Sequence, residues 1–161
     1  MSIEKVKEYF KSVGQDHRVM ELTSSSATVE LAARALNTAP ARIAKTLSFK
    51  RPDGGALLIV AAGDARIENR KFKALFHTKA VMLTPQEAAD LVGHAVGGVC
   101  PFAVNEGVDI YLDISLKRFE TIFPACGSSN SAIELTPEEL ELYTNNQGWV
   151  DVCKNWQDTQ I

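Results

Sequence analysis

A lysine inside an apolar, strand-like segment is the first residue of this chain that could do chemistry. Lys45 lies in the segment Ile43-Ala44-Lys45-Thr46-Leu47. The two-residue repeat of an extended strand would place Lys45 on one face with Leu47 and Phe49. Lysine is rarely buried without a reason, so this amine is a candidate catalytic group. The alternative is a lysine at a strand end that extends its amine to water, and the residue pattern leaves both interpretations open.

A glycine-rich segment is the second candidate. It runs Gly97-Gly98-Val99-Cys100-Pro101. Glycines let backbone amides approach a ligand closely, and proline stiffens the chain that follows. Such a loop could bind an anion, a carbonyl oxygen or a ribose hydroxyl through its N–H groups. Because the segment matches neither a Walker loop nor a dinucleotide fingerprint, a tight turn between a helix and a strand is the alternative.

Small and polar residues form a third candidate segment, Ala125-Cys126-Gly127-Ser128-Ser129-Asn130-Ser131. Hydroxyl and amide groups around a glycine could hydrogen-bond a polar ligand, although a polar turn has the same composition. Asp113 stands before Ser115, which could cap a turn. It is either a ligand contact or a charged strand end.

Several standard catalytic sites lack their parts. The chain has no GxSxG motif, which argues against an α/β-hydrolase. The three histidines are scattered, and the three cysteines have no CxxC spacing, so neither a zinc site nor a disulfide framework is expected. A thiol mechanism using His94 and Cys100 is a remote alternative. No metal or organic cofactor is predicted.

The charge is divided unevenly along the chain. Residues 1–80 carry 14 Lys and Arg against 8 Asp and Glu, whereas residues 81–161 carry 3 against 12. An acidic protein with net charge −3 can thus present a basic face to a polyanion. The densest basic stretch is 66–79, where Arg70, Lys73 and His77 would share one face of a helix. The alternative is a solvated helix face, with the opposite charges of the two halves interleaved in space.

The elements that must position these residues can be predicted from periodicity and caps. Thr84-Pro85-Gln86-Glu87 and Thr136-Pro137-Glu138-Glu139 are capping boxes with proline at the first helical position. Phe72, Leu75 and Phe76 would face inward from the basic helix. Short strands mixed irregularly with helices favour an α/β domain with a curved, mixed sheet. We expect helices over 2–13, 29–36, 70–76, 85–92 and 137–143, and strands over 17–22, 44–50, 56–62, 80–83, 109–114, 131–135 and 149–153. The turn residues Pro52-Asp53-Gly54-Gly55 predict that the strands over 44–50 and 56–62 form a hairpin.

Length and composition indicate an ordinary globular protein. The 161 residues suit a single domain over 1–161, and the hydrophobic share of 45% supports a full core. The charged, amphipathic start does not resemble a signal peptide, and no apolar run is long enough to cross a membrane. We therefore expect a soluble, cytoplasmic protein with reduced thiols.

The three candidate segments, in this order, resemble the YbaK/EbsC family, which includes freestanding deacylases and the editing insert of bacterial prolyl-tRNA synthetases. The segments that carry the resemblance are 43–47, 93–102, 111–113 and 127–129, and the likeness covers roughly 28–140. It implies a compact α/β domain in which helices surround a curved, barrel-like mixed sheet. The implied activity is hydrolysis of the ester between an amino acid and the tRNA 3′ end, with no cofactor.

The resemblance also implies roles for individual residues. Lys45 corresponds to the family's catalytic lysine. Residues implied to bind substrate are Thr46, Gly97, Gly98, Val99, Cys100, Pro101, Asp113, Gly127, Ser128 and Ser129. With tRNA as the polyanion, Arg66, Arg70 and Lys73 would contact phosphates near the acceptor end.

The expected function is therefore a trans-acting aminoacyl-tRNA deacylase for Cys-tRNA(Pro) or Ala-tRNA(Pro). Its expected partners are charged tRNA and, transiently, a synthetase, without DNA or a membrane. The alternative is a non-catalytic module that binds aminoacylated RNA or a nucleotide in the same pocket. The residues identify no general base, and they leave the oligomeric state open.

Overall fold

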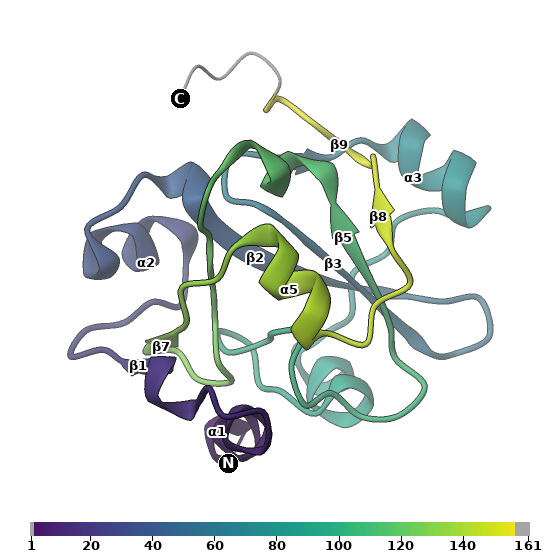
Figure 1. Cartoon of the computed structure of the whole chain (residues 1–161). Coiled ribbons are helices and arrows are strands. Elements are labelled where there is room, and N and C mark those ends of the chain that lie inside the picture. The colour runs from purple at the N-terminus through teal and green to yellow at the C-terminus, as the bar shows by residue number, and fades with distance from the viewer. Residues whose placement is uncertain (1, 157–161) are drawn as a thin grey trace.

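A mixed β-sheet forms the centre of the protein (Figure 1). The computed structural model describes residues 2–156, and its main sheet has five strands in the order β6-β2-β3-β5-β8. β2 and β3 are antiparallel, whereas β6, β5 and β8 run parallel to their neighbours. The predicted α/β fold with a mixed sheet is confirmed, although the five strands form an open sheet with two edges. Their bounds are Ile43–Lys50 (β2), Ala56–Ala62 (β3), Asp109–Asp113 (β5), Phe123–Pro124 (β6) and Trp149–Val150 (β8).

β2 and β3 form the hairpin that the sequence predicts around residues 51–55. The register pairs Lys45 with Ala61. In the turn, the Asp53 carboxylate accepts a hydrogen bond from the Gly55 N–H at 2.9 Å, which is how aspartate stabilises tight turns. Every residue of β3 is buried, so this apolar strand anchors β2 in the middle of the molecule.

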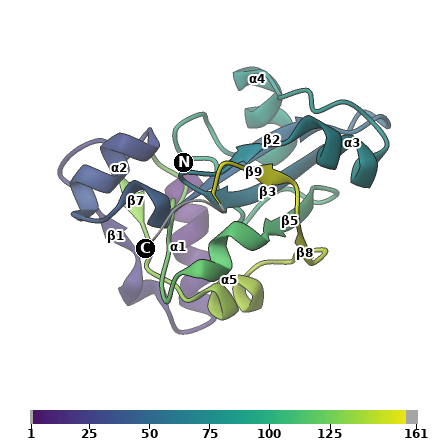
Figure 2. The same ribbon diagram turned by 90° about the horizontal axis from the view of Figure 1, so that it is seen from above.

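Helices cover both sides of the sheet. α1 and α5 lie on one side of it, and α3 and α4 lie on the other (Figure 2). Both predicted capping boxes are present, at Thr84 and Thr136. The helices are Ser2–Ser12 (α1), Val29–Leu36 (α2), Asn69–Phe76 (α3), Pro85–Glu87 (α4) and Pro137–Tyr143 (α5), with 3₁₀ turns at Pro40–Arg42 (η2) and Ile114–Arg118 (η4).

Two short antiparallel ribbons join segments that are distant in sequence. β1 (Met20–Glu21) pairs with β7 (Ser131–Ala132), and β4 (Arg66–Ile67) pairs with β9 (Cys153–Lys154). The first ribbon brings the serine-rich segment after β1 close to the polar loop before β7. The second brings the C-terminal part of the described chain beside the segment that leads into α3.

Five predicted elements differ from the structure. The expected strand over 131–135 is reduced to the two-residue β7, and the one over 149–153 is divided between β8 and β9, which lie in different sheets. The expected strand over 17–22 is a 3₁₀ turn, η1 (Asp16–Arg18), followed by the two-residue β1. Segment 80–83 contributes only an isolated bridge, because Met82 alone pairs with Phe49 of β2. The expected helix over 85–92 changes after α4 into a π-helical turn, η3 (Ala88–Val92).

α3 packs on the sheet through its aromatic residues. Phe72 lies 5.0 Å, between ring centroids, from Phe49 of β2, and Phe76 lies 4.9 Å from Tyr111 of β5. The predicted inward direction of Leu75 is wrong, since this residue is 45% exposed. A helix of 8 residues presents one narrow stripe to a sheet, and the two phenylalanines, four residues apart, occupy it.

The main hydrophobic core contains residues from α1 to β9. A smaller cluster lies under α2 and includes Ala32, Ile43 and Phe123. A single domain over 1–161 stays a prediction. Within residues 2–156, no helix combines the length and the apolar character that a membrane span requires.

Candidate functional site

The outer edge of β2 changes its partner part-way along the strand. At its start, Ile43 and Ala44 pair with β6. Near its end, Phe49 pairs with Met82. Between these contacts, residues 45–47 have β3 on one side and no strand of the described chain on the other. The edge of β2 is therefore open over three residues.

Thr46 directs its backbone groups into this open edge. Ser48 O accepts a hydrogen bond from Leu83 N at 3.1 Å, and Lys50 N donates to Val81 O at 2.8 Å. Both bonds point away from β3. Because every second residue of a strand points its N–H and C=O to the same edge, those of Thr46 point there too. An N–H donor and a C=O acceptor are thus available to a ligand.

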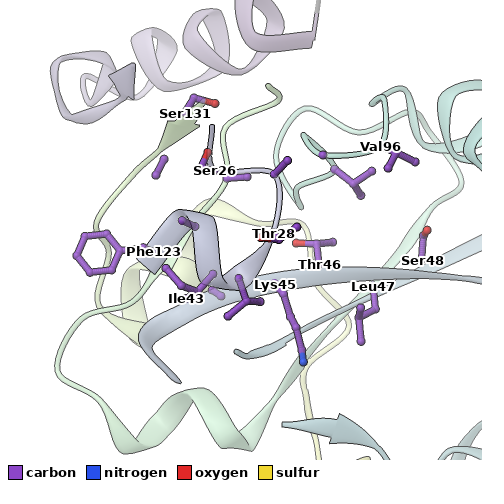
Figure 3. A pocket seen from close by; sticks show the side chains of 18 of the residues that line it. Ser26, Thr28, Ile43, Lys45, Thr46, Leu47, Ser48, Val96, Phe123 and Ser131 are labelled. Atoms are coloured by element: carbon purple, nitrogen blue, oxygen red, sulfur yellow. The ribbon is translucent and has the colours of Figure 1, made fainter. Parts of the chain in front are cut away.

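A pocket of about 410 Å³ opens at this edge. We call it the hydroxyl pocket, because five of its lining residues are Ser26, Thr28, Thr46, Ser48 and Ser131 (Figure 3). Apolar side chains complete the walls. The remaining lining residues are Ala27, Val29, Ala32, Leu36, Ile43, Ala44, Lys45, Leu47, Met82, Leu83, Ala88, Val96, Gly97, Val99, Phe123, Ala125 and Ala132.

Two hydroxyls of this pocket are buried without a partner. Ser26 Oγ and Thr46 Oγ1 make no hydrogen bond within the described part of the chain. By contrast, Thr28 Oγ1 caps α2 by accepting from Leu31 N at 3.2 Å. An unsatisfied buried polar group costs about 1–3 kcal/mol, which a ligand with a complementary polar group would relieve. The two unpaired hydroxyls are therefore available to a polar ligand.

Lys45 lies on the opposite side of β2. Figure 3 shows Lys45 and Leu47 pointing away from the side that carries Thr46 and Ser48. The predicted alternation is thereby confirmed. The ammonium donates to Gly63 O at 3.3 Å and also to the carbonyl oxygen of Ala65. Lys45 thus lines the hydroxyl pocket only with the part of the residue near the strand. Its ammonium lies on the other side of β2.

The Lys45 ammonium has a lowered pKa. Burial is the largest cause, because a charged amine loses solvation there. The positive charge of Arg66 lowers the pKa further, whereas Cys153, Asp64 and Glu30 oppose the shift.

The glycine loop contributes less to the pocket than its sequence indicates. Gly97 and Val99 line it, but Gly98 does not. The Gly98 N–H already donates to Ala95 O at 3.0 Å, and a side chain at this position would lie 2.7 Å from the backbone of Gly127. Gly98 therefore serves close packing between two loops, and its amide is not free for substrate.

The other predicted contacts in this loop lie in the interior. Cys100 and Pro101 are buried outside the lining of the hydroxyl pocket. Burial raises the pKa of the Cys100 thiol to about 12, and its sulfur lies 3.5 Å from His94 Nε2. A protonated thiol is a poor nucleophile, so this geometry disfavours the thiol mechanism.

Asp113 has a structural role in place of the predicted ligand contact. It is fully buried and accepts hydrogen bonds from Ser115 N and Val152 N, both at 3.0 Å. The carboxylate joins the end of β5 to the segment between β8 and β9. It does not line the hydroxyl pocket.

The polar loop lies just behind the pocket wall. Gly127 packs against the start of α1, and Ser128 donates a hydrogen bond to Ser131 Oγ at 2.7 Å. Ser129 accepts from Ser26 N at 2.6 Å through its carbonyl oxygen. None of the residues from 127 to 129 lines the pocket itself. They position Ser26 and Ser131, which do.

A comparison with protein families identifies the family of this chain. Residues 23–142, about three quarters of the chain, match the family model of the aminoacyl-tRNA editing domain. The chain belongs to this family. The open edge of β2 and every residue that lines the hydroxyl pocket fall inside the matched range.

Relatives of this editing domain extend over most of its length. The uncharacterized protein YwhH of Bacillus subtilis is 50% identical over 157 residues, which cover 98% of this chain and all of the relative. EbsC of Enterococcus faecalis, described as a candidate Cys-tRNA(Pro)/Cys-tRNA(Cys) deacylase, is 27% identical over 88% of this chain and 81% of its own. A crystal structure of a candidate trans-editing enzyme for prolyl-tRNA synthetase superimposes with a TM-score of 0.84, at 30% identity and with 95% and 97% of the two chains covered.

The residues predicted to contact tRNA phosphates lie on the surface and do not line the hydroxyl pocket. Arg66 of β4 and Arg70 and Lys73 of α3 are exposed, as is His77. The neighbouring Lys71 is engaged with Asp151 at 2.9 Å. The predicted common face of Arg70, Lys73 and His77 is therefore open to solvent.

Sequence reasoning missed most of the residues that line the hydroxyl pocket. Ser48 follows from the alternation that places Thr46, and Ser131 belongs to the third candidate segment, but Ser26 and Phe123 enter the pocket through tertiary contacts. A run of serines at 24–26 was the only local signal for Ser26. Within residues 2–156, no cluster of His, Cys, Asp and Glu side chains is arranged to hold a metal ion.

Proposed function

We propose that this editing domain hydrolyses the ester bond between an amino acid and the 3′ end of a mischarged tRNA, acting in trans. The observation that carries the proposal is the hydroxyl pocket, with two unpaired hydroxyls at an open strand edge. Its relatives support it, since one is described as a candidate Cys-tRNA deacylase and another as a candidate trans-editing enzyme. A separate hydrolytic site adds discrimination where a synthetase distinguishes one methylene by only about 1–3 kcal/mol.

In this proposal, Thr46 stabilises the reacting ester. Its N–H and its hydroxyl both reach the open edge, where they would donate to the carbonyl oxygen as negative charge develops on it. Gly97 and Val99 line the same pocket and would restrict the orientation of the ester. Lys45 holds the RNA side of the substrate from the other face of β2.

Water activation is assigned to the substrate. Lys45 is the only ionisable side chain among the residues that line the hydroxyl pocket, and its amine points away. No carboxylate or imidazole of this lining can act as a general base. The neighbouring ribose hydroxyl of the terminal nucleotide is the substrate group best placed to accept or relay the proton.

The pocket suits a small, neutral amino acid. A charged side chain would lose its solvation there without gaining a partner, because the lining offers no carboxylate and the Lys45 charge lies elsewhere. Cysteine and alanine attached to tRNA(Pro) meet this condition. The acceptor end of the tRNA is the proposed partner, with a transient contact to the synthetase that releases it.

The decisive experiment incubates the protein with a panel of mischarged tRNAs and measures release of the amino acid. We expect deacylation of Cys- or Ala-tRNA(Pro), and a loss of at least about 100-fold in kcat/KM for Lys45→Ala. Lys50→Ala is the matched control, because Lys50 is an exposed residue of the same strand. Thermal melting of both variants checks that they fold.

Two results would contradict the proposal. A folded Lys45→Ala variant with full activity would remove this residue from the site. A protein that retards charged tRNA in a gel but leaves every ester of the panel intact would be a binding module instead of an enzyme.

A further inference from the structure

A second pocket, of about 600 Å³, lies on the Lys45 side of β2. We call it the cationic pocket, because its lining includes Lys45, Arg66 and Lys154. Val29, Lys45 and Leu47 line both pockets, so the two pockets adjoin at β2 and the start of α2. The other residues that line the cationic pocket are Val29, Glu30, Leu47, Gly63, Asp64 and Ile67.

Two like charges face each other across the β4–β9 ribbon. The antiparallel register places Arg66 directly opposite Lys154, and side chains at such positions project from the same face. Like charges directly opposite one another destabilise a strand pair. The repulsion between these two side chains therefore destabilises the β4–β9 pairing.

Neither cation is neutralised by a close partner. The Arg66 side chain is exposed, and it forms no side-chain hydrogen bond or ion pair with another residue of the part of the chain that the structure describes. Lys154 lies 3.8 Å from a Glu68 carboxylate oxygen, with half of its side chain exposed, a separation and exposure at which ion pairs contribute little.

The two carboxylates of the cationic pocket do not cancel this charge. Asp64 is held by Arg118, whose guanidinium donates to its two oxygens at 3.0 and 2.5 Å. Glu30 is exposed in the first turn of α2. Among the residues that line the cationic pocket, three cations thus face two carboxylates, one of which already has a cationic partner.

We propose that Arg66, Lys154 and Lys45 form a subsite for the 5′-phosphate of the terminal nucleotide, one nucleoside away from the ester in the hydroxyl pocket. The inference rests on the proposed function and deepens it. A phosphate would remove the repulsion between Arg66 and Lys154 and provide acceptor oxygens for both. Lys154 lies outside residues 23–142, the range that matches the family model.

The test compares two compounds that resist hydrolysis. Both carry alanine on a 3′-amino-3′-deoxyadenosine through an amide bond, and only one has a 5′-phosphate. Isothermal titration calorimetry at neutral pH and low salt gives the Kd of each compound. Because hydrogen bonds to charged groups are stronger than neutral ones, we expect the 5′-phosphate to lower Kd at least about tenfold.

The variants locate the effect. In the double variant Arg66→Ala, Lys154→Ala, the ratio of the two Kd values should approach one. Lys11→Ala is the control and should keep the ratio of the unchanged protein, because Lys11 is an exposed cation of α1, at the opposite end of the molecule from β9 in Figure 1.

Equal Kd values for the two compounds would overturn the subsite, as would a ratio that survives in the double variant, or the absence of binding by both compounds. Deacylation of charged tRNA tests the proposed function separately. A protein that deacylates tRNA and yet ignores the 5′-phosphate is an editing enzyme without this subsite. A protein that prefers the phosphorylated compound and releases no amino acid keeps the subsite and loses the enzymatic proposal.

Discussion

Thr46 and Lys45 are neighbours in sequence and serve opposite sides of one strand. Thr46 offers a hydroxyl and backbone groups to the hydroxyl pocket, whereas Lys45 sends its ammonium to the carbonyl oxygens of Gly63 and Ala65. This division follows from the two-residue repeat of a strand. A substrate that spans the open edge of β2 can therefore meet a neutral site and a cationic site within two residues.

Replacing Thr46 by valine tests the role of its unpaired hydroxyl. Thr46→Val removes a buried group that has no partner, so stability should be unchanged or rise by up to about 1 kcal/mol. The kcat/KM for deacylation should fall by about 10- to 100-fold, since a donor to the reacting carbonyl is lost. Urea denaturation and single-turnover kinetics measure the two effects.

Thr28→Val is the matched control for this substitution. The Thr28 hydroxyl caps α2, so its removal should cost about 1 kcal/mol of stability. If Thr46→Val instead loses stability as Thr28→Val does and keeps full activity, the Thr46 hydroxyl has a structural partner and no catalytic role.

The lowered pKa of Lys45 predicts how deacylation depends on pH. Burial and, secondly, Arg66 favour the neutral amine. As pH rises through this lowered pKa, the ammonium loses its proton and kcat/KM should fall. Arg66→Ala removes a repelling charge, which raises the pKa of Lys45 and should move the alkaline limb to higher pH.

The measurement is kcat/KM against pH, with spontaneous hydrolysis of the ester subtracted. An alkaline limb that keeps its position in the Arg66→Ala variant would show that a group other than Lys45 controls it. The test depends on the pH at which the alkaline limb falls and not on the size of kcat/KM. Because Arg66 also belongs to the proposed RNA-binding surface, its removal should lower kcat/KM at every pH.

At the scale of elements, the glycine loop and the polar loop stabilise each other. Gly98 packs against the backbone of Gly127 and Ser128, and Ser129 holds Ser26 in the pocket wall. Only Gly97 of the two adjacent glycines faces the ligand space. The two loops therefore support the pocket wall. Gly98 serves the packing between them, whereas Gly97 lines the pocket.

Replacing each glycine by alanine should separate the effect on packing from the effect on ligand binding. A Cβ at Gly98 would lie 2.7 Å from backbone atoms, so Gly98→Ala should destabilise the fold by about 2 kcal/mol or more. At Gly97 the nearest atoms are 3.4 and 3.5 Å away, and the main obstacle is its φ of +93°, which costs alanine about 1 kcal/mol.

Thermal melting and kcat/KM together decide between these outcomes. Gly97→Ala should lower activity more than stability, because its methyl group enters the ligand space. Equal losses of stability in the two variants would mean that both glycines serve only the packing of the loops.

At the scale of the whole molecule, ion pairs join the basic half of the sequence to the acidic half. Arg18 binds Glu139 at 2.7 Å, and Arg51 binds Asp109 at 3.0 Å. Arg42 and Lys71 also pair with residues of the acidic half, Glu134 and Asp151. The basic character of the N-terminal half is thus largely neutralised by folding, and Arg70 and Lys73 of α3 remain among the exposed cations.

These two cations should contribute to tRNA binding. A double variant, Arg70→Ala and Lys73→Ala, should raise KM for charged tRNA and flatten the dependence of log K on log salt by roughly 0.7–0.9 per lost phosphate contact. Its kcat should change little, because such contacts are equal in the ground and transition states. Lys11→Ala again controls for charge alone. An unchanged KM and an unchanged salt slope would identify α3 as a solvated face.

The sequence by itself determined the features that depend on neighbours along the chain. The alternation of β2, the turn around Asp53 and the capping boxes at Thr84 and Thr136 are local, because side-chain direction and backbone capping involve residues at most a few positions apart. The ordered motifs were enough to predict the family. Of the site residues that they imply, Lys45, Thr46, Gly97 and Val99 line the hydroxyl pocket.

Only the tertiary structure decided which of these groups face a ligand. Gly98 and Asp113 have the residue types of binding groups, but contacts with Gly127 and Val152, distant in sequence, use them for packing and hydrogen bonding. The open edge of β2 exists because one partner strand ends before the next begins, and the opposition of Arg66 and Lys154 depends on the pairing of strands far apart in the chain. Such long-range pairings are set by the packing of the whole core, which no local pattern specifies.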